Sequence, residues 1–103
     1  MNVANNKNTS SKTLDRMSND ENREVRIGVA FNPNTSTETL DRLSKEESEY
    51  VRMNVAYNKN TSTEALDRLS EDENEYVREN AKSNLSKKQN GGIDFSKMTP
   101  ELR

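Results

Sequence analysis

The stretch "NTSTETLDRLS" at residues 34–44 decides the fold, because almost the same string occurs twice more in the chain. Residues 8–18 read "NTSSKTLDRMS" and residues 60–70 read "NTSTEALDRLS", so the interval is 26 residues each time. Extended over the whole interval, the copies span 3–28, 29–54 and 55–80, and a partial fourth copy begins at Ala81 and fades by Leu85. The second and third copies agree at 19 of 26 positions. A fixed period of this length is typical of stacked repeat proteins.

Each copy carries two helix-start signals. Thr35 with Glu38, and then Ser44 with Glu47, have the capping-box spacing, in which a hydroxyl and a carboxylate satisfy backbone N–H groups. The longer helix is expected to end at Asn58, because asparagine tolerates the left-handed conformation that ends helices. The signals predict a short and a longer helix per copy, about 62–69 and 71–83 in the third. The equivalents elsewhere are Thr61 with Glu64, Ser18 with Glu21, Ser70 with Glu73, Asn32 and Asn84.

The apolar residues of each copy form two helical stripes. Leu40 and Leu43 lie one turn apart on the short helix, and Val51 and Val55 do so on the longer one, with Ala56 beside them. A single helical hairpin cannot bury both stripes, so it must stack on its neighbours. The sequence therefore predicts an all-α solenoid of three 26-residue two-helix repeats over residues 1–85. The equivalent residues are Leu14, Met17, Val25, Val29, Leu66, Leu69, Val77 and Ala81.

The string "EYVRMNVAYNKNTSTEALDRLS" at residues 49–70 resembles the leucine-rich repeat variant family, a relative of the HEAT-like helical repeats. The resemblance covers residues 1 to about 85 and implies a right-handed superhelix of short paired helices. Family members commonly carry proline where this chain has Ser10, Ser36 and Ser62. A founding example carries an iron–sulphur module, which a chain without cysteine cannot hold. The family shares no common activity, so the resemblance implies a fold rather than a function.

Composition excludes several classes of site. The chain is 28% hydrophobic and 33% charged, and it contains neither cysteine nor histidine. Disulfides, thiolate or imidazole metal ligands and the usual general base are therefore absent. Carboxylate clusters such as Glu71–Asp72–Glu73 stand where a helix dipole already favours negative charge, and no loop has calcium-ligand spacing. We expect no enzyme activity, no cofactor and no metal. Because no apolar run reaches signal-peptide or membrane-span length, we expect a cytoplasmic chain.

Two charged ladders repeat with the period. One ladder consists of aspartates and the other of arginines, and the arginines are spaced to bind phosphates or carboxylates. Alternatively, each aspartate pairs with an arginine of the neighbouring repeat, and recurrence in every copy favours this structural interpretation. The acidic ladder is Asp15, Asp41 and Asp67, and the basic ladder is Arg26, Arg52 and Arg78.

A second apolar stripe on the longer helices is the candidate binding face. On a helical wheel, Tyr50, Met53 and Tyr57 lie on a different face from Val51 and Val55. The stripe either packs against the adjacent repeat or forms a concave wall for a partner, since tyrosine and methionine are enriched at interfaces. The candidate partner-binding residues are Ile27, Phe31, Tyr50, Met53, Tyr57 and Tyr76.

Charge and the two ends of the chain bear on partners. Residues 1–81 hold 11 basic and 16 acidic residues, which argues against binding duplex nucleic acid. Residues 86–92, "SKKQNGG", read as a flexible linker, and the tail 93–103 either caps the third repeat, docks on a partner or second copy, or stays unstructured. Val3, Leu14 and Met17 lack a preceding repeat to bury them, so self-association through this N-terminal face or through the tail is a further expectation.

These observations favour a scaffold that presents the longer-helix face to a protein or peptide. The alternative is a small acidic inhibitor that occupies the basic cleft of a nucleic-acid-binding protein, as on mobile elements. Neither hypothesis requires a membrane.

Overall fold

The computed structural model describes residues 3–91, which contain six α-helices, one short 3₁₀ helix and no strand. The prediction of an all-α fold is confirmed for this part of the chain. Two kinds of helix alternate, because each seven-residue helix is followed by a longer one. The elements are η1 (Val3–Asn5), α1 (Ser11–Met17), α2 (Arg23–Phe31), α3 (Thr37–Leu43), α4 (Glu49–Tyr57), α5 (Thr63–Leu69) and α6 (Glu75–Gly91).

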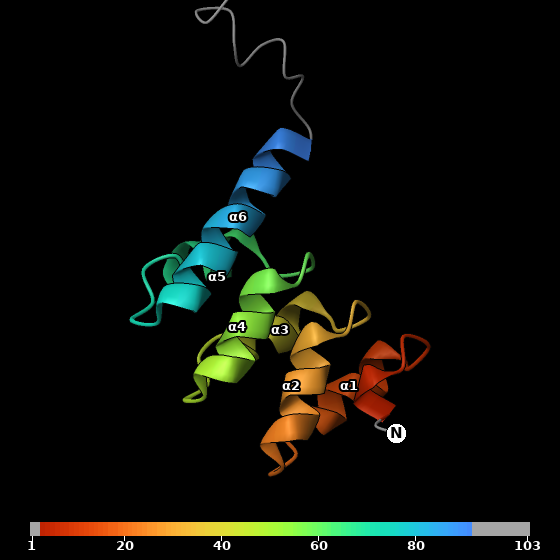
Figure 1. Cartoon of the computed structure of the whole chain (residues 1–103). Helices are drawn as coiled ribbons and strands as arrows, with labels where there is room; N and C mark the ends of the chain where they lie inside the picture. Colours follow the sequence, from red (N-terminus) through yellow and green to blue (C-terminus); the bar gives the residue numbers. More distant parts are fainter. Residues whose placement is uncertain (1–2, 92–103) are drawn as a thin grey trace, which may run out of the picture.

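The helices form two layers. Figure 1 shows α2, α4 and α6 side by side in one row, with α1, α3 and α5 behind them. Within the row α2 packs on α4 and α4 packs on α6, and each short helix packs on the longer helix that follows it. The row of longer helices therefore presents one continuous face, and the short helices cover the other.

The predicted apolar stripes form the core. Leu40, Leu43, Val51, Val55 and Ala56 are all buried, as predicted. Their equivalents in the other copies belong to the same cluster, although two of them, Met17 and Val25, are only partly buried. The core is thin, and each copy supplies a similar small set of side chains. Buried in the same cluster are Leu14, Val29, Leu66, Leu69, Val77 and Ala81.

The short helices begin one residue later than predicted. Ser36 is the N-cap of α3, and its hydroxyl accepts a hydrogen bond from the backbone N–H of Thr39. Thr35, the predicted cap, is fully buried and its hydroxyl donates to the carbonyl of Val29 at 2.6 Å. The prediction was wrong because this threonine closes the turn after α2 rather than opening α3. The hydroxyl of Thr61 likewise donates to the carbonyl of Val55 and closes the turn after α4.

The longer helices begin about four residues later than predicted. Ser48 is the N-cap of α4, whereas the predicted cap Ser44 ends α3 and donates its hydroxyl to the carbonyl of Asp41. The capping-box spacing of Ser44 with Glu47 was therefore misleading, since residues 44–48 form a loop between the two helices. The asparagines Asn22 and Asn74 occupy the equivalent capping positions before α2 and α6.

A ladder of buried asparagine amides connects the copies. Asn58 Nδ2 donates to the carbonyls of Ala30 and Asn32, at 2.8 and 2.9 Å. Asn32 and Asn58 end α2 and α4 as predicted, but in extended rather than left-handed backbone, because the amide must reach back to the preceding copy. Asn84 repeats the contact with Ala56 and Asn58.

Helix α6 passes its predicted end. It continues through Asn84 to Gly91, so residues 86–91 of the predicted flexible linker are helical. The turn after α2 and α4 depends on the hydroxyls of Thr35 and Thr61, and the equivalent residue here is Lys87, which cannot make that bond. The predicted tail at 93–103 lies outside the described residues.

The N-terminal face is more closed than predicted. Leu14 is fully buried, although Val3 is 54% exposed and Met17 is half-buried. The short helix η1 packs on α2, and Gly28 allows its approach, since a Cβ there would lie 3.0 Å from the Cβ of Ala4.

Candidate interaction groove

The six candidate partner-binding residues divide into two groups. Ile27 and Met53 are partly buried and pack against the core. The four aromatic residues are at least half exposed, and they lie at the two ends of the longer helices. The exposed fractions are 53% for Phe31, 50% for Tyr50, 60% for Tyr57 and 64% for Tyr76.

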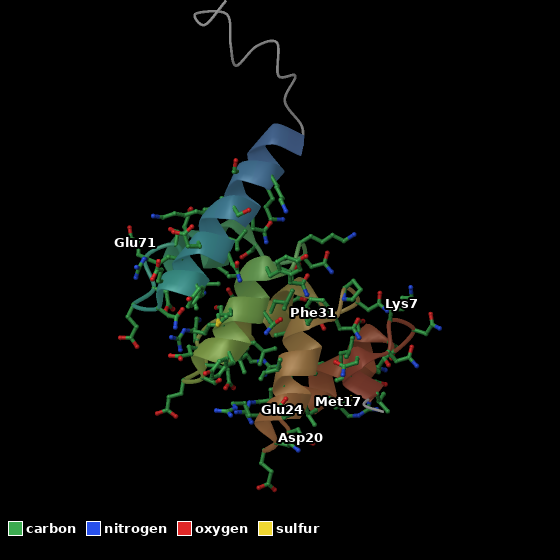
Figure 2. All side chains as sticks on the ribbon, viewed as in Figure 1. Lys7, Met17, Asp20, Glu24, Phe31 and Glu71 are labelled. Carbon is green, nitrogen blue, oxygen red and sulfur yellow. The ribbon has the colours of Figure 1, made fainter. Side chains whose placement is uncertain are left out.

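Phe31 and Tyr57 are the pair of candidates that the structure brings together. Their rings are stacked with centroids 5.9 Å apart and planes 6° from parallel. The two residues occupy the same position in successive copies, and Figure 2 shows Phe31 at the C-terminal end of α2, next to α4. The third copy has Ser83 at this position, so the row of rings stops at Tyr57.

A groove opens beside the last ring of this row. Its volume is about 560 Å³, and it lies between the C-terminal ends of α2 and α4 on one side and α6 on the other. The last turns of α6, which extend beyond the end of α4 in Figure 1, form one wall. The groove exists because α6 does not stop where α2 and α4 do. Its lining residues are Phe31, Pro33, Tyr57, Asn58, Lys59, Asn80, Ser83, Asn84, Lys87 and Lys88.

The groove is positively charged. Lys59, Lys87 and Lys88 line it and no carboxylate does, although residues 1–81 of the chain are acidic on balance. Lys88 Nζ donates to the carbonyl of Lys59 at 2.8 Å and so connects the two walls. The ammonium groups of Lys59 and Lys87 make no hydrogen bond or ion pair within residues 3–91, which leaves their charge available to a ligand.

The side-chain amides of Asn80 and Asn84, which line the groove, already donate hydrogen bonds within the protein. Asn84 bonds the carbonyls of Ala56 and Asn58, and Asn80 Nδ2 donates to the carbonyl of Met53 at 3.1 Å. These bonds fix α6 against α4. Hydrogen bonds from side-chain amides to backbone carbonyls therefore hold the walls of the groove in place before a ligand binds, which reduces the entropic cost of binding.

Tyr50 and Tyr76 lie away from the groove, in the first turns of α4 and α6. The guanidinium of Arg23 lies 5.4 Å from the centre of the Tyr50 ring, within cation–π range. Acidic side chains lie near the starts of the longer helices, and Figure 2 labels Asp20 and Glu24 beside the start of α2 and Glu71 beside the start of α6. The longer helices thus have an acidic end and an opposite end that carries the stacked rings and the lysines of the groove.

The acidic ladder contacts arginines of the next copy. Asp15 Oδ1 lies 2.7 Å from Arg42 Nη2, and Asp41 Oδ1 lies 3.2 Å from Arg68 Nη2. The same arginines also bond the hydroxyls of Ser18 and Ser44, the C-cap residues of the preceding copy's short helix. Asp67 forms no ion pair in the described part of the chain.

The basic ladder uses different partners. Arg26 pairs with Glu46 at 3.2 Å and Arg52 with Asp72 at 2.7 Å, each acid belonging to the loop of the following copy. Arg78 Nη1 instead donates to the carbonyls of Asp72 and Glu73. These contacts occupy the guanidinium groups that sequence reasoning considered as a phosphate site.

The ion pairs shift the acidity of their partners. A hydrogen bond from Thr39, assisted by Arg42, holds the pKa of Asp15 below its ordinary value. Burial raises the pKa of Asp72, but hydrogen bonds from Arg52 and from the backbone N–H of Asn74 outweigh it, so the net shift is downward. The hydrogen bond to Asp72 raises the pKa of Arg52. Each shift favours the charged form and stabilises the contact between copies.

A second depression of about 410 Å³ lies near the acidic end, beside Arg26 and Glu46. Its lining carries both signs of charge, and Arg26 and Glu46 pair with each other. Within residues 3–91, no group of three or more acidic side chains is placed to hold a metal ion, and no helix is both long and apolar enough to cross a membrane.

Sequence reasoning missed the lysines of the groove, whereas the end of the aromatic row at Ser83 can be read from the sequence. The period itself carried the signal, because adding 26 to Tyr57 reaches a serine and therefore marks a gap in the aromatic row. The lysines gave no signal, since their placement depends on the continuation of α6. Comparisons of the chain with protein-family models, with curated proteins and with solved structures find no significant match.

Proposed function

We propose that this chain is a short right-handed α-solenoid of three repeats that binds a peptide segment of another protein along its longer-helix face. The observation that carries the proposal is the stacked pair Phe31–Tyr57, which is more than half exposed and opens directly onto the lysine-lined groove. Exposed aromatic side chains beside a preformed concavity are the usual anchors of an interface.

The recurrence of contacts at one interval supports the solenoid part of the proposal. The asparagine amides bond carbonyls 26 and 28 residues earlier in each copy. The pairs Asp15–Arg42 and Asp41–Arg68 are likewise both 27 residues apart. Contacts between nearest neighbours only are the feature that defines a solenoid.

The chemistry of the groove supports binding rather than catalysis. Its side chains offer ring stacking, apolar contact and positive charge, and its amides already bond the protein. A peptide can use all of these without reaction. The function proposed is therefore that of a non-enzymatic scaffold.

The test is a selection of random twelve-residue peptides displayed on phage, with the complete chain as bait. We expect enriched peptides to lose more than about 2 kcal/mol of binding free energy on Tyr57→Ala, because an interface anchor is removed. Tyr76→Ala is the matched control, since Tyr76 is equally exposed but lies outside the groove. The proposal fails if no peptide is enriched, or if the selected peptides bind wild type and Tyr57→Ala equally well.

The second candidate function is inhibition of a nucleic-acid-binding protein by the acidic end. The loops before α2, α4 and α6 bring exposed carboxylates to this one end, including Asp20, Glu47 and Glu73. An electrostatic mimic should lose affinity steeply as ionic strength rises, and substitution of these three residues by their amides should abolish it. Retention of binding by that triple variant would exclude the candidate.

A further inference from the structure

The groove contains a gap in a row of rings. Phe31 and Tyr57 stack, and the third member of the row is Ser83, whose side chain is far too small to continue the stack. Ser83 is exposed and lines the groove together with Tyr57. The Tyr57 ring lies against Phe31 on the side of α2, and Ser83 belongs to α6, which packs on the other side of α4. The aromatic side chain of a ligand placed here would continue the row of rings.

Charge defines the residues that flank the ligand's ring. Lys59 and Lys87 carry ammonium groups without a partner in the described residues, and Lys88 bonds only a carbonyl. No lining residue is acidic. A ligand that brought positive charge into the groove would meet three cations, whereas carboxylates beside the ring would pair with them.

From these two observations we infer that the groove binds an acidic peptide whose aromatic residue stacks on Tyr57 over Ser83, with neighbouring carboxylates on the lysines. The inference rests on the proposed function and names the chemistry of the partner. The groove accepts the ring because α6 supplies a serine, and it selects acidic neighbours because the added turns of α6 carry lysines.

The probe is the peptide Asp-Asp-Phe-Asp-Asp, blocked at both ends so that only side chains carry charge. It is titrated calorimetrically into the complete chain, beside Asp-Asp-Ala-Asp-Asp and Lys-Lys-Phe-Lys-Lys. We expect the first peptide to bind about tenfold more tightly than either control, since one control lacks the ring and the other has the wrong charge. Its affinity should fall as salt is raised, because the lysines are exposed.

Two variants locate the ring and the charge. Ser83→Tyr completes the row of rings and should lower affinity at least about tenfold, because the added ring fills the gap. Its control is Lys82→Tyr, which adds the same ring to an exposed position on another face of α6 and should leave affinity unchanged. Lys87→Glu should also weaken binding, and Lys82→Glu should not.

Three outcomes would overturn the inference. The first is equal binding of the three peptides, and the second is full binding to Ser83→Tyr. The third concerns the chain itself, whose sequence contains Asp94 followed by Phe95. If Phe95→Ala raises the affinity of the probe several-fold, that segment competes for the groove, and the assignment to a partner is wrong. Phage-selected peptides of different composition that still require Tyr57 would uphold the proposed function while overturning this inference.

Discussion

Arg52 on α4 and Asp72 in the loop before α6 form a two-point ion pair that is largely shielded from water. Nε lies 2.7 Å from Oδ2 and Nη2 lies 3.1 Å from Oδ1, and each side chain is only 11% exposed. Arg52 Nη1 also donates to the carbonyls of Glu46 and Glu47. One guanidinium therefore connects the loops of two successive copies.

Arg52→Ala should destabilise the protein by about 2–4 kcal/mol, because it leaves a shielded carboxylate without its partner. Arg68→Ala is the control, since its pair with Asp41 is almost half exposed and such pairs contribute at most about 1 kcal/mol. Urea unfolding monitored by circular dichroism measures both. Similar losses in the two variants would show that burial does not determine the strength of these pairs.

Acid should remove the contribution of Asp72. Its pKa in the folded chain lies below the ordinary value of 3.8, so the stabilisation is complete above that value and is lost as pH falls through the lower folded-state pKa. Asp72→Asn should therefore be less stable than wild type at pH 7, and the difference should shrink as pH falls below about 4. A difference that stays constant down to the acid unfolding transition would contradict the shift.

Asn58→Ala should lower the free energy of unfolding by about 2–4 kcal/mol, because it leaves the buried carbonyls of Ala30 and Asn32 without this hydrogen-bond donor. The matched control is Asn54→Ala in the same helix, which removes only an exposed bond to the carbonyl of Tyr50. In Asn58→Ala, backbone amides near residue 58 and near Ala30 and Asn32 should exchange their hydrogens faster than in wild type. Equal stability of the two variants would mean that the ladder contributes nothing.

Leu40→Ala should cost about 2–5 kcal/mol, since Leu40 is fully buried in the middle of the core and its removal leaves a cavity. Glu38→Ala, two residues earlier and exposed, should change stability by less than about 1 kcal/mol. Thermal melts of both variants test this. A melt of Leu40→Ala that matches wild type would contradict the core described above.

The period allowed the helix pairs and the core to be predicted, because stripes such as Leu40–Leu43 and Val51–Val55 repeat in every copy. Helix boundaries were predicted less well, since Thr35 and Ser44 are hydroxyl residues that bond backward to the preceding helix rather than forward to the next. Local spacing does not distinguish the two directions of a hydrogen bond.

The candidate site was predicted in part. Phe31 and Tyr57 were identified as one face, and the structure places them in contact. The basic side of the groove was not foreseen, because Lys87 and Lys88 were assigned to a linker. Their placement depends on the continuation of α6 past Asn84, where Lys87 stands at the position that Thr35 and Thr61 occupy in the other copies.

The asparagine ladder has a consequence for how the gene can change in length. Each amide donates to carbonyls 26 and 28 residues earlier in the sequence, and each of these separations spans one whole copy. Recombination that adds or removes a complete copy would leave each remaining amide opposite an equivalent pair of carbonyls. Insertion of a few codons within one of the longer helices would displace the amide from both carbonyls, so such short insertions should destabilise the protein.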